Sequence, residues 1–451
     1  TYNDDVTLGA GTTITTTSNG SNSFAGTVTG IQTLSITTNG TGTTTFTGAV
    51  GATNAPTSIT ISTDVLTAAA IKVSGALSVT NANVSTGSTI TGIISNGTSA
   101  ASLTKAGAGK LTLSGVNTYT GVTTINAGTL SVGTIGDGGV AGNLGQATNT
   151  ATNIVLGGGT LRYTGSTATS DRAFTINAGA TAIIDVSSGV TATLAGATGT
   201  STNGALTKTS SGRLNLTGVN TYTGATTISA GTLAITGSGS LGSGTYAGAI
   251  ANSGTLIYSS SATQTLSGII SGAGTLTRTG HTFAGWSLVT TNGSGPLVGP
   301  TYTPTVPVKL YSSWTPNVYI VTYNANGGVG LPSRSTDSYT YGTTALTLPT
   351  VGTLTRQGFT FRGWGTATNT AVASAMTTTY TPTASITLYA IWQGNPYTVT
   401  FNKNETSATG TMSTQAITGG TAVNATANAF ARVGYTFGSW NTAADGTGTT
   451  V

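Results

Sequence analysis

The sequence predicts an all-β chain in which a parallel β-solenoid precedes a series of small repeat modules. Three observations predict this fold class. Gly supplies 67 of the 451 residues, and Thr is more frequent still. Because Gly favours tight turns and β-branched Thr favours strands, we expect many short strands and no long helices. The third observation is that two kinds of internal repeat divide a chain with room for two to four domains.

The composition excludes several classes of function. The formal charge of +5 comes from only 14 basic and 9 acidic residues, and the nearest thing to a basic cluster is the pair Lys105 and Lys110, so we expect no nucleic-acid partner. The chain has no Cys, which excludes disulfides and thiolate metal sites. Because no apolar run approaches ~18 residues, we expect no membrane insertion within this segment. The start at Thr1, without a signal peptide, predicts an internal or processed fragment.

The first repeat lies in the N-terminal part. Residues 103–133 align with residues 206–236, and 20 of the 31 aligned positions are identical. Apolar residues alternate in each copy, and Gly residues or the sequence Asn-Thr-Tyr-Thr-Gly interrupt them, a pattern typical of short strands joined by tight turns. The residues predicted to lie in the core of these repeats are Leu111, Leu113, Leu214 and Leu216.

Residues 1–275 read as one solenoid, because short strand-like runs recur without a helical stretch between them. At about 20–25 residues per turn, this segment gives ~11–14 turns and a rod of roughly 50–65 Å. The expected strands include Thr33–Ile36, Ser58–Ile61, Ile71–Val73, Ile154–Leu156 and Ala182–Val186.

The repeated motif also carries a family resemblance. The pattern G-x-L-x-L-x-G-x-N-T-Y-T-G, followed by T-x-I-x-A-G-T-L, resembles the passenger-associated transport repeat of bacterial autotransporter proteins. The resemblance is clear in residues 103–133 and 206–236. It implies a β-helical passenger that is secreted or exposed at the bacterial cell surface.

The second repeat begins where aromatic residues become frequent. Residues 274–286 align with residues 352–364 with 10 of 13 positions identical, and a third copy lies at 432–440. One full unit spans about 318–392. The expected domains are the solenoid at 1–275, an incomplete first module at 276–317 fused to the solenoid, a complete module at 318–394 and a third, truncated module at 395–451.

This unit is similar to the Listeria–Bacteroides repeat, the B-repeat of internalin-type surface proteins. The similarity rests on V-T-Y-N-x-N-G-G, R-x-G-Y/F-T-F-x-G-W and L-Y-x-x-W. It implies small β-grasp-like modules strung in tandem in extracellular proteins as spacers and adhesive units. The first copy lacks the opening segment, and the third lacks the closing L-Y-x-x-W.

Large aromatic residues recur at fixed positions in these modules. They could form a carbohydrate-stacking platform, but in a module of about 75 residues the closing of a small core is the stronger interpretation. A ligand surface is then expected on the loops 291–300 and 366–374. The predicted repeat core consists of Phe283, Trp286, Tyr311, Trp314, Phe361, Trp364, Tyr389, Trp392, Phe437 and Trp440.

Few residues could support catalysis, since the chain has one His and nine acidic residues. Their spacing in the solenoid is irregular, and Asp171-Arg172 is interpreted as a solvated turn, so we expect no catalytic, cofactor or metal site and no enzyme. His281 takes the position of Phe359 and Tyr435 and is interpreted as a packing substitute. The candidate catalytic residues in the solenoid are Asp64, Asp137, Asp171, Asp185, Arg162 and Arg172.

Thr-x-Thr triplets suggest an ice-binding face, which would need a regular Thr array on consecutive turns. Their separations along the sequence are irregular, so the ordinary interpretation is that Thr suits the exposed face of a strand. The triplets are centred between Thr43 and Thr45, Thr89 and Thr91, Thr118 and Thr120, and Thr191 and Thr193.

We therefore expect a non-enzymatic extracellular protein with a structural or adhesive role, forming an elongated stalk or fibre at the bacterial cell surface. Its expected partners are further copies of itself, other surface proteins or glycans, because low charge permits close packing and solenoid ends expose strand edges. One alternative is a polysaccharide-binding or polysaccharide-degrading β-solenoid. The other is an ice-binding adhesin segment.

Overall fold

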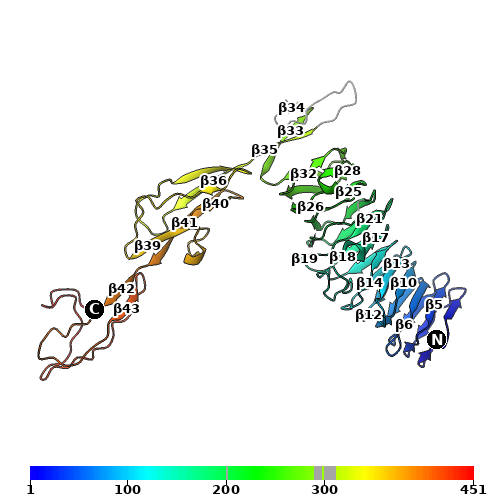
Figure 1. Ribbon diagram of the computed structural model, residues 1–451, viewed down its shortest axis with the longest axis horizontal. Helices are drawn as coiled ribbons and strands as arrows, with labels where there is room; N and C mark the ends of the chain where they lie inside the picture. The colour runs from blue at the N-terminus through cyan, green and yellow to red at the C-terminus, as the bar shows by residue number, and fades with distance from the viewer. Residues whose placement is uncertain (200–201, 289–296, 299–310) are drawn as a thin grey trace. The chain divides into compact units, whose positions relative to one another are not determined.

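Short parallel strands stack coil upon coil through the first unit of the chain, Thr1–Thr279 (Figure 1). The computed structural model describes residues 1–199, 202–288, 297–298 and 311–451. The second unit is Gly280–Val451. Each unit has a hydrophobic core of its own.

Two long parallel sheets form most of the solenoid. The eight-stranded sheet contains, in order, β2 (Thr12–Thr16), β5 (Thr33–Thr38), β7 (Ser58–Thr63), β10 (Ala76–Asn81), β13 (Ser102–Ala106), β15 (Thr123–Ile125), β17 (Ile154–Leu156) and β20 (Thr175–Ile176). The twelve-stranded sheet contains β3 (Asn22–Phe24), β6 (Thr43–Phe46), β8 (Val65–Ala68), β11 (Ser88–Ile90), β14 (Lys110–Leu113), β16 (Thr129–Val132), β18 (Thr160–Tyr163), β21 (Thr181–Val186), β23 (Ala205–Thr209), β25 (Thr226–Ile228), β28 (Ile250–Asn252) and β31 (Ile270–Ser271).

A third sheet and three short parallel pairs complete the coils. The third sheet contains β19 (Ala168–Ser170), β22 (Thr191–Leu194), β24 (Arg213–Leu216), β26 (Thr232–Gly237), β29 (Thr255–Ser260) and β32 (Thr275–Arg278). The pairs are β1 (Val6–Thr7) with β4 (Val28–Thr29), β9 (Ile71–Val73) with β12 (Ile94–Asn96), and β27 (Thr245–Tyr246) with β30 (Thr265–Leu266). Two 3-10 turns, η1 (Ala151–Asn153) and η2 (Gly242–Gly244), lie between strands.

The predicted parallel solenoid is confirmed. The twelve strands of the longest sheet correspond to about 12 turns, within the predicted range, and they rise roughly 55–60 Å at the spacing of parallel strands. Each strand-like run expected from the sequence forms a strand. The coils are unequal in length. Residues that pair on neighbouring coils are close in sequence in one case, Ile59 with Leu77, and farther apart in another, Thr123 with Ile154.

Stacked apolar side chains fill the solenoid. Leu34, Ile59 and Leu77 are register partners on consecutive coils, and each is at most 1% exposed. Burial of one such side chain contributes about 1.5–3 kcal/mol relative to its exposed state. In the first coils, the rings of Tyr2 and Phe24 stack with centroids 4.8 Å apart, and Phe24 stacks on Phe46 at the same separation. Each coil therefore provides the surface on which the next coil packs.

The second unit contains small antiparallel and mixed sheets. Its described elements are β33 (His281–Ser287), β34 (Leu297–Val298), β35 (Tyr311–Pro316), β36 (Val318–Asn324), β37 (Thr336–Thr340), β38 (Leu346–Thr347), β39 (Phe359–Gly365), η3 (Val372–Ser374), β40 (Thr379–Tyr380), β41 (Ile386–Gly394), β42 (Pro396–Val399) and β43 (Gln415–Thr418).

A four-stranded sheet of order β37-β36-β41-β39 forms the middle of this unit. Strands β36 and β41 are parallel, and the two outer strands are antiparallel to them. The described residues place no α-helix on this sheet, so the β-grasp-like interpretation is not confirmed. The boundaries predicted for the individual modules also stay a prediction.

The repeat found in the sequence recurs in the strand pairing. Strand β33 pairs with β35 as β39 pairs with β41, and both pairs carry a register shift at the same place, between Phe283 and Gly285 and between Phe361 and Gly363. Strand β42 pairs with β43 as β36 pairs with β37. The glycines at 285 and 363 have positive φ angles of 138° and 136°, which favour Gly at this irregularity.

Candidate functional site

Both copies of the solenoid repeat turn a lysine into the interior. Lys105 and Lys208 occupy equivalent positions and are 0% exposed. Lys105 Nζ donates hydrogen bonds to the carbonyl oxygens of Ala106 (2.6 Å), Gly107 (2.8 Å) and Ala127 (3.2 Å). Lys208 makes the equivalent bonds to the two residues that follow it. Burial lowers the pKa of both amines to about 8. The hydrogen bonds of both amines thus stabilise the chain turn that follows each strand.

The Asn-Thr-Tyr-Thr-Gly segment of each copy places a tyrosine side chain in the interior of the solenoid. Tyr119 and Tyr222 are at most 1% exposed. The Tyr119 hydroxyl lies 2.6 Å from Thr123 Oγ1, and the Tyr222 hydroxyl lies 3.0 Å from Thr226 Oγ1. Burial raises the pKa of Tyr119 to about 12 and also raises the pKa of Tyr222. Both phenols therefore stay protonated, with their hydroxyls hydrogen-bonded inside the protein.

Arg172 is buried, and the prediction that Asp171-Arg172 forms a solvated turn is wrong. The Arg172 side chain is 2% exposed. Its Nε donates to the Gly136 carbonyl oxygen at 2.7 Å, and its terminal nitrogens donate to carbonyl oxygens of Val140 (3.2 Å), Gly145 (2.7 Å) and Ala147 (3.1 Å). A guanidinium offers five donors in a fixed fork, so one side chain bonds a whole loop. Burial lowers the pKa of Arg172.

The structure brings Asp137 and Asp171 together in the same loop. The Asp171 main-chain N–H donates to Asp137 Oδ1 at 3.0 Å. Asp171 Oδ1 accepts a hydrogen bond from the Gly138 N–H at 2.7 Å, and Oδ2 accepts one from Asn149 Nδ2 at 3.0 Å. Both carboxylate oxygens of Asp171 thus bind the loop that Arg172 holds from the inside. This arrangement favours a structural role over general acid or base catalysis.

The other candidate catalytic residues lie elsewhere in the solenoid. Asp64 Oδ2 accepts a hydrogen bond from Asn83 Nδ2 at 3.0 Å. Asp185 and Arg162 are register partners on β21 and β18, and Asp185 Oδ1 is buried without a hydrogen-bond partner among the described residues. The described ranges hold no group of three His, Asp or Glu side chains arranged to bind a metal ion.

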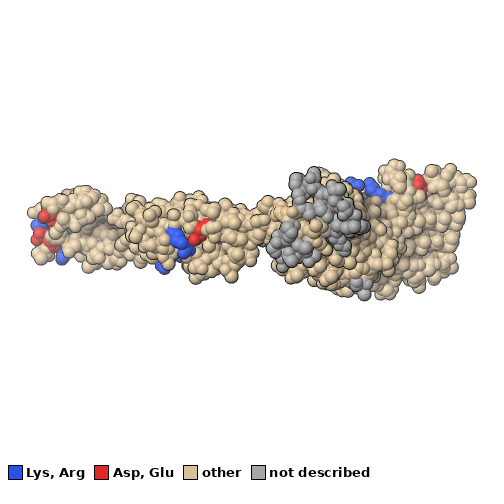
Figure 2. Space-filling view, turned by 90° about the horizontal axis from the view of Figure 1, so that it is seen from above, with Lys and Arg blue, Asp and Glu red and all other residues tan. Residues whose placement is uncertain are grey.

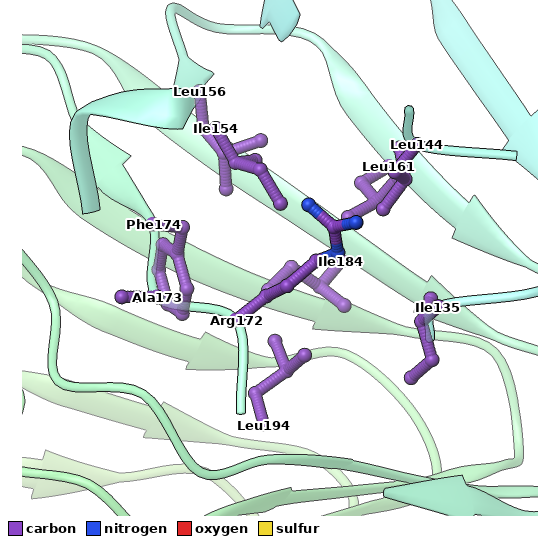
Figure 3. A pocket seen from close by; sticks show the side chains of 10 residues that line it. All are labelled: Ile135, Leu144, Ile154, Leu156, Leu161, Arg172, Ala173, Phe174, Ile184 and Leu194. Atoms are coloured by element: carbon purple, nitrogen blue, oxygen red, sulfur yellow. The ribbon is translucent and has the colours of Figure 1, made fainter. Parts of the chain in front are cut away.

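A cavity beside Arg172 has a volume of about 10 Å³. Figure 3 shows the Arg172 side chain extending between the apolar residues that line it. A space of this size holds at most one water molecule and no sugar ring. The lining residues are Ile135, Leu144, Ile154, Leu156, Leu161, Arg172, Ala173, Phe174, Ile184 and Leu194.

Charged groups are scarce on the face seen in Figure 2, where they occur only as small separate patches. Two ion pairs lie within the described residues: Arg334 with Asp337 at 2.9 Å, and Arg432 with Glu405 at 3.9 Å. Within that same part of the chain, no helix has the length and apolar character needed to cross a bilayer.

The predicted core residues differ in their burial. Leu111, Leu113, Leu214 and Leu216 are at most 1% exposed, and Trp364 is 0% exposed. Trp286, Tyr311, Trp314, Phe361, Tyr389, Trp392 and Trp440 are partly buried. Phe283 and Phe437 are 42% and 45% exposed.

The same aromatic contact recurs in the modules. The rings of Phe283 and Trp286 meet edge to face with centroids 5.4 Å apart, and Phe361 and Trp364 repeat this geometry at 5.4 Å. Edge-to-face contact is a favourable geometry for aromatic rings, so these pairs stabilise packing within each module. The assignment of all these rings to the core stays a prediction. The recurrence of the contact offers no argument for a sugar-binding platform.

His281 lies among aromatic neighbours. Its ring meets Tyr341 edge to face at 5.5 Å. At the equivalent positions, Phe359 packs under the Arg356 guanidinium, and Tyr435 packs under Arg432. All three equivalent side chains thus make ring contacts. Of the two predicted ligand loops, 366–374 is largely exposed, and 291–300 lies outside the described residues apart from 297–298.

The structure places outward Ser and Thr side chains in rows that the sequence intervals do not reveal. Thr45 and Thr89, from two of the predicted triplets, stand in one row because Thr67 pairs with both. Thr118 and Thr120 flank the buried Tyr119 instead, and Thr191 and Thr193 lie in a different sheet.

The most regular rows lie on the eight-stranded sheet, and we call them together the hydroxyl lattice. Its residues alternate with the buried apolar positions of the same strands. The first row is Thr13, Ser35, Thr60, Ser78, Thr104 and Thr124, and the second is Thr15, Thr37, Ser62 and Thr80. The Thr-x-Thr pattern does not reveal this lattice, because Ser35, Ser62 and Ser78 occupy positions in its rows.

Comparison with known families confirms both resemblances. Residues 103–132 and 206–235 match the passenger-associated transport repeat. Residues 319–391 and 397–451 match the Listeria–Bacteroides repeat domain.

Curated relatives match parts of the chain. It is 50% identical over 124 residues to the adhesin BmaC autotransporter of Brucella suis biovar 1, a match that covers 27% of this chain and 4% of the adhesin. It is 30% identical over 149 residues to a Gly-rich membrane protein of Evansella cellulosilytica, covering 30% of this chain and 17% of that protein. The chain thus spans a small fraction of either relative. No solved structure is significantly similar to it. The adhesin similarity and the passenger-associated repeats indicate an extracellular or cell-surface location.

Proposed function

We propose that this chain is a non-enzymatic segment of a bacterial surface adhesin, in which a stiff β-solenoid stalk carries β-grasp-like repeat modules as spacers or weak adhesive units. One observation carries the proposal. The passenger-associated repeats form coils in which the buried amines of Lys105 and Lys208 are bonded to the protein's own main chain. Function is thereby left to the outer faces.

The Brucella relative supports the adhesive part of the proposal, since it is named an adhesin and shares 50% identity over 124 residues. The pairing of successive coils supports the stalk role. Each coil forms parallel β-sheet pairs with the next coil, and a stack of coils paired in this way resists bending.

Self-association is a further part of the proposal. Strand β2 lies at the end of the eight-stranded sheet and, within the described residues, pairs with a strand on one side, β5. Unpaired main-chain groups at such an edge favour pairing with another strand. Sedimentation velocity over a hundredfold range of concentration tests this part: a growing sedimentation coefficient supports it, and a constant monomer value contradicts it.

Attachment of coated beads tests the adhesive role. Beads carrying the covalently linked chain are passed over epithelial cells and over glass, and the retained fraction is compared with that of beads carrying heat-unfolded chain. We expect retention only with the folded chain. Equal retention of both kinds of bead would contradict an adhesive function.

The polysaccharide-degrading alternative makes a different prediction. It requires the release of reducing ends from a glycan and the loss of that release on substitution of Asp171 or Asp185. The bonding of Asp171 within its loop argues against this reaction, so we expect no release by the wild-type chain or by Asp185→Asn.

A further inference from the structure

The hydroxyl lattice is a two-dimensional array with regular spacing. Neighbouring rungs of a parallel sheet lie about 4.8 Å apart, and alternate residues along one strand lie roughly 6.6 Å apart. Thr13, Ser35 and Thr60 are direct register partners, as are Thr15, Thr37 and Ser62. Three consecutive coils therefore present two parallel rows of hydroxyl groups, and Ser78 and Thr80 extend both rows to a fourth coil.

The chemistry of this face is uniform. Every outward residue from β2 to β15 on this sheet is Ser, Thr or Ala. Within the described residues, none of the ten lattice hydroxyls forms a side-chain hydrogen bond to the protein. Each can therefore donate one hydrogen bond and accept two from outside.

The scaffold holds these groups rigidly. Strands β5, β7, β10, β13 and β15 each pair with a strand on both sides, and β2 is the end strand of the sheet. The inward residues between lattice positions, such as Ile36, Ile61 and Val79, are 0% exposed. The β-branched Thr side chains have restricted χ1 angles. A rigid array loses little conformational entropy when it binds an ordered surface.

These features define the partner. The face carries no aromatic ring on which a sugar could stack and no charge for an ionic ligand, but it repeats hydroxyl and methyl groups at intervals comparable to the oxygen repeats on ice surfaces. We propose that the hydroxyl lattice binds ice, by ordering water into a layer that merges with the crystal. This inference goes beyond the adhesion proposal, since a cell surface and an ice surface are different targets.

The two faces of a single coil offer a matched pair of variants. Thr60 lies in β7 at the centre of the lattice, and Thr67 lies in β8 on the twelve-stranded sheet; both are exposed. Thr67 belongs to one row of hydroxyls, but its strand also presents Val65 outward, so that this face lacks a second continuous row. A lysine projects a strongly hydrated charge above either face.

The test is ice-crystal shaping and inhibition of ice recrystallisation by the whole chain at micromolar concentration. We expect activity from the wild type and from Thr67→Lys, and we expect Thr60→Lys to require roughly tenfold more protein for the same inhibition. Absence of activity in the wild type, or an equal loss in both variants, would overturn the proposal.

Two further measurements keep the result interpretable. Circular dichroism verifies that both variants melt as the wild type does; if Thr60→Lys does not, Ser35→Lys replaces it, with the same expected loss. Co-sedimentation with insoluble chitin and cellulose tests a hydroxylated polymer as the partner. Polymer binding that depends on Thr60, without ice shaping, would refute ice binding and leave the adhesion proposal standing.

Discussion

Lys105 and Lys208 occupy equivalent positions in the two copies of the solenoid repeat, and each donates hydrogen bonds from its amine to the carbonyl oxygens of the two residues that follow it. The distances are 2.6 and 2.8 Å for Lys105 and 2.5 and 2.7 Å for Lys208. Both side chains lie on the inward side of their strands, in line with Leu103 and Leu206. A buried amine therefore serves as an internal cap for a chain corner in both repeats.

Substitution of either buried lysine should destabilise the solenoid. Lys105→Met keeps much of the side-chain volume but leaves buried carbonyl oxygens without a donor, which costs about 1–3 kcal/mol. The matched control is Lys110→Met, five residues along on a partly exposed site, where we expect a change within about 0.5 kcal/mol. Thermal melting followed by circular dichroism measures both. Equal midpoints for the two variants would contradict the capping role.

Stability should rise and then fall with pH in the alkaline range. Burial lowers the pKa of Lys105 and Lys208 from 10.5 to about 8, so between these values the unfolded chain binds more protons and the free energy of unfolding rises with pH. Burial raises the pKa of Tyr119 from 10.0 to about 12. Above pH 10 the folded chain holds the extra protons, and stability falls.

Melting midpoints recorded between pH 7 and 11 test this dependence. We expect a maximum near pH 10 for the wild type, and a flatter rise below it for the double variant Lys105→Met, Lys208→Met. A steady fall from pH 7 to pH 10 in the wild type would show that the amines are not buried as described.

Arg172 should control the accessibility of the loop at 136–149. Arg172→Ala removes the donors for four main-chain carbonyl oxygens and enlarges the adjoining cavity, so the loop loses its internal anchor. Limited proteolysis should cut this loop several times faster than in the wild type. The exposed Arg162→Ala is the control, and cleavage at the same rate in both variants would refute the anchor.

Trp364 should be the most sensitive residue of the complete module. It is 0% exposed, and its Nε1 donates to the Pro349 carbonyl oxygen at 2.9 Å. Trp364→Ala should cost about 3–5 kcal/mol in that module, whereas Trp286→Ala, at the partly exposed equivalent position, should cost less. Intrinsic fluorescence during urea unfolding compares them. A smaller effect at Trp364 than at Trp286 would contradict the assignment of the module core.

Much of the fold follows from periodicity in the sequence. Alternation around Leu111 and Leu214 predicts inward and outward residues, and the repeat offsets predict which segments are equivalent. The register between coils does not follow from the sequence, because coil length changes whenever a loop is inserted, as between Thr123 and Ile154. For this reason the rows of the hydroxyl lattice emerge only when the strands are paired.

The polar interior of the solenoid follows less directly from the sequence. Lys105 lies two residues after Leu103 in the alternating pattern, and a lysine recurs at the equivalent position 208, so the sequence contains a signal that this side chain is buried. The charge of lysine normally argues for exposure, because an unpaired buried amine is unfavourable. Arg172 has no repeat partner. Its burial depends on carbonyl oxygens from a loop more than 20 residues earlier, a contact that no local pattern encodes.

The central claim is that the outer faces of a folded, non-catalytic solenoid mediate adhesion. The force needed to remove coated beads from a surface under flow tests this claim most directly. We predict that beads with the wild-type chain and with Asp185→Asn resist the same shear, and that beads with the unfolded chain are swept away. Release of all three at the same shear, or attachment lost in Asp185→Asn together with glycan cleavage by the wild type, would contradict it.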